Sequence, residues 1–249
     1  MAHPPKSIRI MTYNVHSCTG PDGEVSTYRI ADVIARYEPD VVALQELDSG
    51  LERTRRAHQA SEIAEHLNME FHFHPSMETQ SGKYGNAILS RYPMRLVQAG
   101  PLPAPWWFRP FEKRGALWAA VSLGGKEIQI INTHFGHNWR ERLAQSEALL
   151  GAKWAAHTTC NPPLVVCGDL NTLPLSYVYR RFRQFLADAQ LAIKGRRPRG
   201  TYPSRFPVCR IDHIFTSHEV LVLDTEVPRD RLAAKASDHL PLIAELEII

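Results

Sequence analysis

The stretch from Leu164 to Pro174, LVVCGDLNTLP, runs from apolar residues directly into polar ones. Asp169 and Asn171 are two positions apart, and side chains at i and i+2 of an extended chain point to the same side. A turn is the alternative interpretation, because Gly, Asp and Asn are common turn residues. If the extended spacing holds, a carboxylate and a carboxamide face one space at the end of a buried strand.

Other polar residues also lie where predicted strands begin or end. They are Asn14, Glu46, His134, Asp212, Asp238 and His239. Each alone has a simple structural explanation, such as a turn, a solvated strand end, a buried histidine or a helix cap. Strand ends of one layered domain can nevertheless converge on a single cleft. Converging charges would repel one another unless a cation or a phosphate-bearing ligand lay among them.

Strand-like runs that would position these residues recur along the whole chain. They cover residues 8–15, 41–46, 84–91, 116–123, 128–134, 164–169, 210–215, 220–225 and 242–248. The Gly124-Gly125 step indicates a hairpin. No linker or low-complexity segment interrupts the chain, so we expect one domain over residues 1–249.

Helix-like stretches lie between the strands. Thr27 is a candidate N-cap for a helix that runs through Tyr37 and ends before Pro39. A second helix is predicted over residues 58–67 and a longer one over roughly 138–157. In the last, Trp139 and Trp154 fall on the apolar face, which predicts that both are core residues. Hairpins with interspersed helices indicate an α+β or layered α/β domain with stacked sheets.

Composition excludes several classes of protein. The 249 residues carry a formal net charge of +3, which is too weakly basic to identify nucleic acid as a partner. The four cysteines lack the spacing of zinc sites or disulfide frameworks, and Cys167 is predicted to be a small core residue. No secretory signal or membrane-spanning run is visible, so we expect a cytoplasmic protein.

Seven motifs, in order, resemble those of the endonuclease/exonuclease/phosphatase superfamily, the DNase I-like phosphoesterases. They are TYNVH, VVALQE, YGNAILSRYP, INTHF, GDLN, RIDHIF and SDHLP, and they cover nearly the whole chain. The resemblance implies a four-layer αββα sandwich, in which two packed mixed β-sheets are flanked by helices. It also implies hydrolysis of phosphoesters with a divalent metal.

By this resemblance Glu46 binds the metal, with Asn14 beside it binding the metal or a phosphate oxygen. Oxygen ligands suit Mg²⁺, and Mn²⁺ is a possible substitute. His239 is the candidate general base and needs a carboxylate on its other ring nitrogen. Adjacent residues in an extended chain point to opposite sides, so Asp212 is better placed than Asp238 for that contact. Asp238 is then expected to face the metal or phosphate region.

The remaining site residues receive roles by the same resemblance. Asp169 positions or activates the attacking water or binds a second metal, and Asn171 donates hydrogen bonds to a phosphate oxygen. His134 stabilises the phosphoryl oxygens or protonates the leaving group. Asn86 matches a position near the phosphate in several members. The LERTRR stretch supplies candidate contacts for an anionic substrate, Arg53, Arg55 and Arg56, of which Arg55 is the one we expect at the substrate; a solvated loop is the alternative.

The substrate stays open between a nucleic acid and a phospholipid such as sphingomyelin, with a phosphomonoester third. The loop over residues 103–114 carries Trp106, Trp107 and Phe108 among basic residues, which suits a membrane interface or stacking on unpaired bases. The KGRRPRG stretch, residues 194–200, is consistent with a polyanion. A catalytically silent binding module of the same fold is the alternative from another class, but it predicts a gap among the catalytic residues, and there is none.

Overall fold

The computed structural model describes residues 7–106 and 112–249. Its strands are β1 (Ser7–Asn14), β2 (Val41–Ser49), β3 (Glu70–Thr79), β4 (Gly82–Ser90), β5 (Met94–Pro101), β6 (Gly115–Leu123), β7 (Lys126–His134), β8 (Leu164–Asp169), β9 (Ala187–Asp188), β10 (Asp212–Thr216), β11 (Val220–Glu226) and β12 (Leu242–Ile248). Its α-helices are α1 (Thr27–Tyr37), α2 (Gln59–Leu67), α3 (Trp139–Leu150), α4 (Tyr177–Phe182), α5 (Ala189–Ala192) and α6 (Arg231–Ala236).

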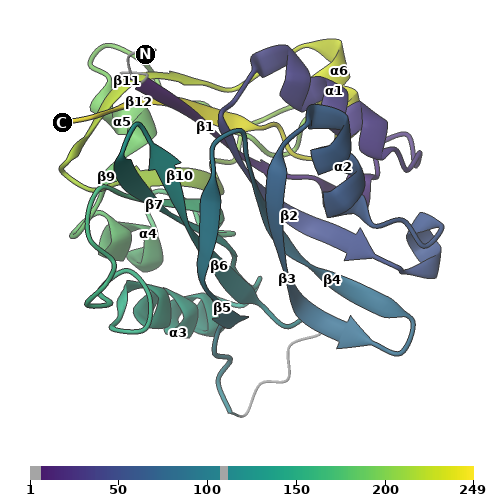
Figure 1. Cartoon of the computed structure of the whole chain (residues 1–249), viewed down its shortest axis with the longest axis horizontal. Helices are drawn as coiled ribbons and strands as arrows, with labels where there is room; N and C mark the ends of the chain where they lie inside the picture. The colour runs from purple at the N-terminus through teal and green to yellow at the C-terminus, as the bar shows by residue number, and fades with distance from the viewer. Residues whose placement is uncertain (1–6, 107–111) are drawn as a thin grey trace.

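The strands form two six-stranded sheets that face each other (Figure 1). The first has the order β11-β12-β1-β2-β4-β3 and the second β5-β6-β7-β8-β10-β9. Both are mixed, because β1 pairs with β2 and β7 with β8 in parallel, while the other pairs are antiparallel. The hairpin predicted at Gly124-Gly125 joins β6 to β7, as expected.

Helices cover the outer faces of both sheets, which gives the predicted four-layer αββα sandwich. Helices α1, α2 and α6 lie on the first sheet, and α3 and α4 lie on the second (Figure 1). Helix α1 shows how the sequence produces this arrangement. Ser26 caps its N-terminus by accepting a hydrogen bond from the Arg29 N–H, and Ile30 and Ile34 on one face are fully buried.

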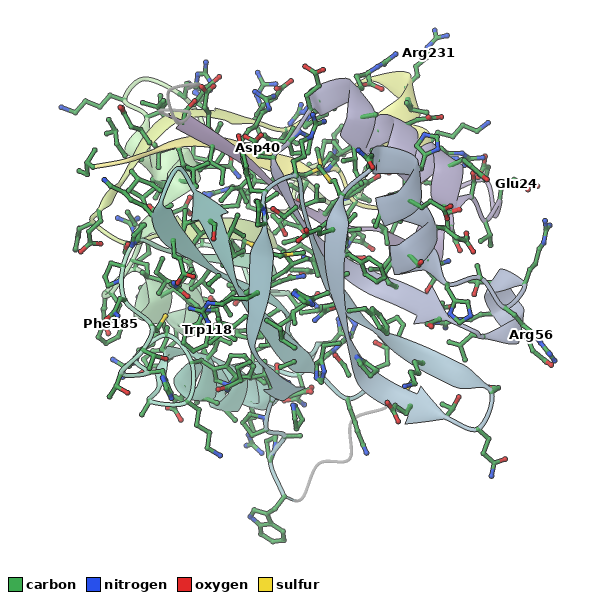
Figure 2. All side chains as sticks on the ribbon, viewed as in Figure 1. Glu24, Asp40, Arg56, Trp118, Phe185 and Arg231 are labelled. Carbon is green, nitrogen blue, oxygen red and sulfur yellow. The ribbon has the colours of Figure 1, made fainter. Side chains whose placement is uncertain are left out.

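A polar bridge crosses the apolar space between the sheets. Asn132 on β7 donates to the carbonyls of Leu44 and Ala87 on the first sheet, at 2.9 and 2.8 Å, and accepts from Gln45 Nε2 at 2.8 Å. Buried polar groups of this kind have to be paired, so the bridge restricts how the sheets can sit against each other. Behind the second sheet, Trp118 is buried and donates from Nε1 to Gln129 at 2.8 Å, whereas Arg56 extends outward (Figure 2).

Three details of the sequence-based prediction were wrong. The cap of α1 is Ser26, and the neighbouring Thr27 hydroxyl instead donates to Glu62 at 2.9 Å. Helix α3 ends at Leu150, since the chain turns at Gly151 instead of continuing to residue 157. Trp139 is 60% exposed, because it begins this shortened helix and lies under Arg140 at its edge; Trp154 is buried as expected.

Cys167 lies in the core as predicted, and all four cysteines are free. In the described part of the chain, no helix is both long and apolar enough to cross a bilayer. Trp107 and Phe108 fall outside the described residues, and Trp106 beside them is 90% exposed.

Candidate active site

The predicted site residues meet where strands of both sheets end. Asn14 is the last residue of β1, His134 the last of β7 and Asp169 the last of β8. The pairing register places Asp169 opposite both His134 and Asp212. Gly168 allows this close approach, because a Cβ atom there would lie 1.8 Å from the Thr133 carbonyl oxygen and its φ is +142°. Neighbouring strands thus bring distant parts of the sequence to one point.

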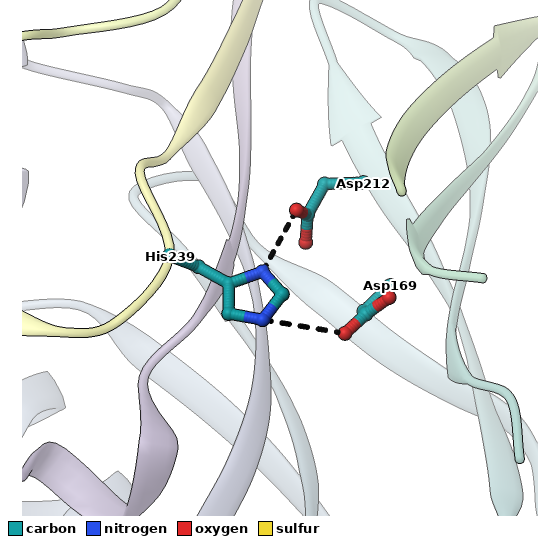
Figure 3. A group of neighbouring side chains, drawn as sticks. All are labelled: Asp169, Asp212 and His239. Carbon is teal, nitrogen blue, oxygen red and sulfur yellow. Dashed lines mark hydrogen bonds and ion pairs between the residues drawn. The ribbon is translucent and has the colours of Figure 1, made fainter. Parts of the chain in front are cut away.

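His239 and Asp212 form the first half of the site. His239 Nδ1 lies 2.9 Å from Asp212 Oδ2, and the Thr201 hydroxyl donates to the same oxygen at 2.5 Å. The other ring nitrogen, Nε2, faces Asp169 Oδ2 at 3.7 Å (Figure 3). Asp238 points elsewhere, with Oδ1 3.7 Å from His16 Nδ1 at the rim of the site. Asp212, which arrives from another strand, is therefore the carboxylate that orients His239.

Asp169 lies at the centre of the group. Its Oδ2 accepts a hydrogen bond from Asn14 Nδ2 at 3.0 Å, and the same nitrogen donates to Glu46 Oε1 at 2.9 Å. His134 Nε2 is 3.6 Å from Asp169 Oδ2 and 3.9 Å from Glu46 Oε1. Two carboxylates and two histidines therefore share one space, which joins Glu46 to His239 within a single site.

The electrostatics of this space raise two pKa values. Burial, with the nearby Asp212 charge, raises the pKa of Asp169 to about 7. Burial lowers the pKa of His239, but Asp212, Asp169 and Asp238 outweigh that effect and raise it to about 10. In the metal-free site these shifts favour a charged imidazolium on His239 and make Asp169 a stronger proton acceptor than an ordinary carboxylate.

Arg114 completes the second half of the site, and sequence reasoning missed it. Its side chain is only 3% exposed, and Nη1 lies 3.0 Å from His134 Nδ1, while Nη2 pairs with Glu112 at 2.9 Å. A guanidinium can only donate, so Nδ1 of His134 accepts and Nε2 carries the proton. Burial, followed by the Arg114 charge, holds the pKa of His134 well below its usual range. His134 is thus a neutral imidazole whose N–H faces Asp169.

Arg114 was hidden because it ends a run of basic and aromatic residues that looks like an exposed loop. The available signal was its position directly before the buried strand β6. A long cationic side chain at a strand's start can turn back toward the sheet edge, and here that edge carries His134.

The two predicted asparagines differ in their surroundings. Asn171 has a left-handed φ of 47°; its backbone N–H donates to Asp169 Oδ1 at 2.8 Å, and its amide nitrogen donates to the Phe135 carbonyl at 2.9 Å. That amide also lies 3.1 Å from His134 Nε2. Asn86 is buried and donates to the Gly115 carbonyl at 3.2 Å, so its amide N–H links the two sheets beside Arg114.

Glu46 owes its orientation to a β-bulge. The register of β2 against β4 shifts between Leu44 and Leu47, and Glu46 has a φ of 62°. Bulges redirect side chains and often lie beside functional sites, where such backbone strain is tolerated. Glu46 lines a cavity of about 380 Å³ together with Tyr84, Glu112 and Arg53.

The arginine in this cavity is Arg53 instead of the predicted Arg55. Arg53 makes a two-pronged contact with the buried Asp48, from Nε to Oδ2 at 2.7 Å and from Nη2 to Oδ1 at 2.6 Å. Arg55 follows the 3-10 turn Glu52–Thr54 and is exposed. Arg53 lines this cavity, whereas Arg55 does not.

The donor set suits a divalent cation. Carboxylate oxygens of Asp169 and Asp212 lie within 4.8 Å of each other and of a ring nitrogen of His239, and Glu46 adds a partly exposed carboxylate. Carboxylate oxygens favour Mg²⁺ or Mn²⁺ over softer metals. Asn14 turns its amide nitrogen toward the carboxylates, while its oxygen accepts from the His16 N–H at 3.0 Å. In this geometry Asn14 links the two carboxylates instead of offering an oxygen to a metal.

Comparison with known proteins shows the family of the chain. A model of the Endonuclease/Exonuclease/phosphatase family matches residues 11–239. The chain belongs to this family. It is similar to the protein YbhP of Escherichia coli (strain K12), with 26% identity over 97% of both chains.

Two solved structures from Bacteroides thetaiotaomicron share the fold. One is an endonuclease/exonuclease/phosphatase family protein with a TM-score of 0.80 and 23% identity, covering 100% of this chain and 97% of that one. The other is the mannosyl-6-phosphatase Bt3783, with a TM-score of 0.79 and 22% identity, covering 96% and 99%. Membership in this hydrolytic family makes the protein a phosphoesterase-class enzyme.

Proposed function

We propose that the protein hydrolyses phosphodiester bonds with the help of Mg²⁺, which Mn²⁺ can replace. The observation that carries the proposal is the convergence on Asp169 Oδ2. This oxygen lies 3.0 Å from Asn14 Nδ2, 3.6 Å from His134 Nε2 and 3.7 Å from His239 Nε2. A carboxylate between two ring nitrogens supplies both a proton acceptor and donors for a phosphoryl group in one small space.

The metal would be held by Glu46, while Asp169, whose oxygen faces the same space, stays free to act on the attacking water. A bound Mg²⁺ supplies positive charge against the phosphoryl oxygens and the leaving oxygen. The second carboxyl oxygen of Asp212 is buried and has no hydrogen-bond partner among the described residues, so this carboxylate also has a free ligand position. These features support a metal-assisted reaction.

The pKa directions favour Asp169, instead of His239, as the group that takes the proton from the attacking water. Asp169 has a pKa raised to about 7 by burial and by Asp212, which suits a general base at neutral pH. His239, with a pKa of about 10, is protonated at neutral pH and can donate a charged hydrogen bond to a phosphate oxygen. Asp212 then acts by holding this imidazolium in place.

His134 would act from the other side of the phosphoryl group as a neutral donor. Arg114 fixes the tautomer that directs Nε2–H into the site. Asn171, whose amide nitrogen lies 3.1 Å from Nε2, would donate to another phosphate oxygen. Two further residues are candidate contacts for the substrate or the metal. Asp238 lies at the rim of the site, and Asn86 lies where the two sheets meet.

A phosphodiester of a nucleic acid is the favoured substrate, and a phospholipid head group is the alternative. Peripheral membrane contact through Trp106, Trp107 and Phe108 belongs to that alternative. A phosphomonoester is a further candidate, supported by the similarity to the mannosyl-6-phosphatase. A silent binding module is disfavoured because the chain retains every residue of the proposed machinery.

Hydrolysis of bis-p-nitrophenyl phosphate tests the proposal, with p-nitrophenyl phosphate in parallel as the monoester. We expect activity with Mg²⁺ or Mn²⁺, loss of activity with EDTA, and loss in His239→Ala. His218→Ala serves as the matched control, because this exposed histidine lies outside the site. Full activity in EDTA or in His239→Ala would contradict the mechanism, and a strong preference for the monoester would make the monoester the substrate class.

A further inference from the structure

A large basic hollow lies away from the carboxylates of the active site. We call it the arginine hollow; it has a volume of about 880 Å³ and lies between residues 195–200, 207–208 and 224–229. Four arginines line it: Arg196, Arg197, Arg199 and Arg229. Three of them belong to the KGRRPRG stretch, which follows α5, and the opposite wall comes from the end of β11 (Figure 1).

The hollow has an excess of positive charge. Its two carboxylates are already paired, Asp224 with Arg196 and Glu226 with Arg9 at 3.0 Å. The guanidinium groups of Arg197, Arg199 and Arg229 have no carboxylate within ion-pair distance among the described residues. Like charges gathered around one hollow repel each other unless an anion lies among them. Guanidinium groups are especially suited to phosphate, which they bind with two parallel hydrogen bonds.

The backbone that carries these arginines is held in place. The Arg199 N–H donates to Gln190 Oε1 at 2.7 Å, and Gln190 Nε2 donates back to the Arg199 carbonyl at 3.3 Å. Arg196 Nη1 donates to the Thr225 carbonyl at 2.9 Å. Gly200 lets the chain pass close to Pro207, since a Cβ there would be 2.7 Å from the Pro207 carbonyl oxygen. This wall is therefore ordered before any ligand arrives.

One loop connects the hollow to the catalytic pair. Gly200 and Val208 line the hollow, and the two residues after Gly200 contact the active site. Thr201 donates to Asp212 Oδ2, and the ring of Tyr202 packs against His239 with centroids 4.8 Å apart. The Val208 N–H donates to the Tyr202 carbonyl at 3.1 Å, which closes the loop. A ligand that crosses this loop would reach both places.

The same loop exposes aromatic faces. Phe206 is 73% exposed and Tyr202 is 36% exposed. Exposed rings beside a basic groove are the combination by which proteins hold single-stranded nucleic acid, since unpaired bases stack on the rings and phosphates bind the cations. A phospholipid such as sphingomyelin carries a single phosphodiester, which the catalytic centre itself would occupy. Only a polymer of phosphodiesters would use both the centre and the hollow.

We propose that the arginine hollow binds phosphate groups of a single-stranded nucleic acid whose scissile diester lies at Asp169 and His239. The strand crosses the loop formed by residues 200–209, with bases on Tyr202 and Phe206. This inference rests on the proposed function and names the substrate class of that site.

Binding of a fluorescein-labelled single-stranded oligonucleotide, followed by fluorescence anisotropy in EDTA over a salt series, tests the inference without hydrolysis. The test variant is Arg197→Glu/Arg229→Glu. The control is Lys153→Glu/Arg180→Glu, which changes two exposed cations outside the hollow and alters the net charge equally. We expect the test variant to bind at least about 10-fold more weakly, with the salt slope reduced by about 1.4 for two lost phosphate contacts. The control should change affinity less than about 2-fold.

Other outcomes are decisive as well. If both double variants lose the same oligonucleotide affinity, the effect comes from net charge alone and the inference is overturned. If neither variant loses affinity, the inference is overturned as well. Loss of binding to phosphatidylserine vesicles with unchanged oligonucleotide binding would assign the hollow to a membrane. Hydrolysis of bis-p-nitrophenyl phosphate should be unchanged in both double variants, which also shows that they fold. If wild type lacks that hydrolysis but the anisotropy difference persists, only the proposed function fails.

Discussion

The two histidines of the active site are the same residue type in opposite electrostatic surroundings. Both are nearly fully buried, and both place Nε2 within 4 Å of Asp169 Oδ2. The Nδ1 atom of His239 contacts a carboxylate, Asp212, whereas that of His134 contacts a guanidinium, Arg114. The pKa of His239 is accordingly raised to about 10, and the pKa of His134 is held well below its usual range.

The difference teaches that the partner of Nδ1 decides whether each histidine is charged or neutral. Burial alone would lower the pKa of both, because it penalises the charged form. Asp212 reverses this effect on one side, and Arg114 reinforces it on the other. The site therefore holds one charged and one neutral donor around a single carboxylate, and three substitutions and one pH measurement can break or sharpen this contrast.

Removing the shared carboxylate should have the largest effect. Asp169→Asn keeps the size of the side chain but removes the charge between the two rings and the proposed proton acceptor. We expect kcat/KM for bis-p-nitrophenyl phosphate to fall by about 1,000-fold or more. Asp224→Asn, in the arginine hollow, is the matched control and should retain activity. A fall of less than 10-fold would show that Asp169 is not the base.

Removing the partner of His239 should make the two histidines alike. In Asp212→Asn the pKa of His239 should drop from about 10 toward the ordinary histidine value, because burial is then opposed only by Asp169 and Asp238. Activity should fall by about 100-fold. An NMR titration of the ring protons, assigned with His239→Gln, measures the pKa directly. An unchanged pKa would mean that Asp212 does not sustain the charged state.

The contrast also predicts a pH dependence of stability in the metal-free protein. An unfolded histidine loses its proton near pH 6.5, while folded His239 keeps it to about pH 10. The contribution of His239 to the free energy of unfolding is therefore complete below pH 6.5 and is lost as the pH rises through about 10. The raised pKa of Asp169 acts in the same direction.

Urea unfolding in EDTA at pH 6 and pH 9 measures this dependence. We expect the free energy of unfolding to be lower at pH 9 by on the order of 2 kcal/mol. Asp212→Asn should show a much smaller difference between the two pH values. Equal stability of wild type at both would contradict the raised pKa of His239.

The smallest effect is expected on the other side of the site. Arg114→Met should raise the pKa of His134, although burial keeps it below the ordinary value. The tautomer is then no longer fixed, so kcat should fall by about 10-fold, with a new dependence on pH near the histidine range. Arg95→Met, at an exposed ion pair, is the control. A change in KM alone would indicate that Arg114 acts on substrate binding.

Much of this architecture could be predicted from the sequence. The strand runs and the motifs anticipated the sandwich and its site-bearing strand ends, and the alternation of side chains selected Asp212 as the partner of His239. Where the prediction failed, the cause was local: Gly151 ended α3 early, which left Trp139 exposed, and the 3-10 turn directed Arg53 instead of Arg55 into the cavity.

By itself the sequence determined which chemical groups stand at the strand ends, because periodicity fixes their positions and faces along each strand. It did not determine their protonation states. Those depend on burial and on partners such as Arg114 and Asp212, which lie far along the chain and become neighbours only when the strands pair. Only the tertiary structure decided that one histidine is charged and the other neutral, because electrostatic interactions follow distance in space and not separation in sequence.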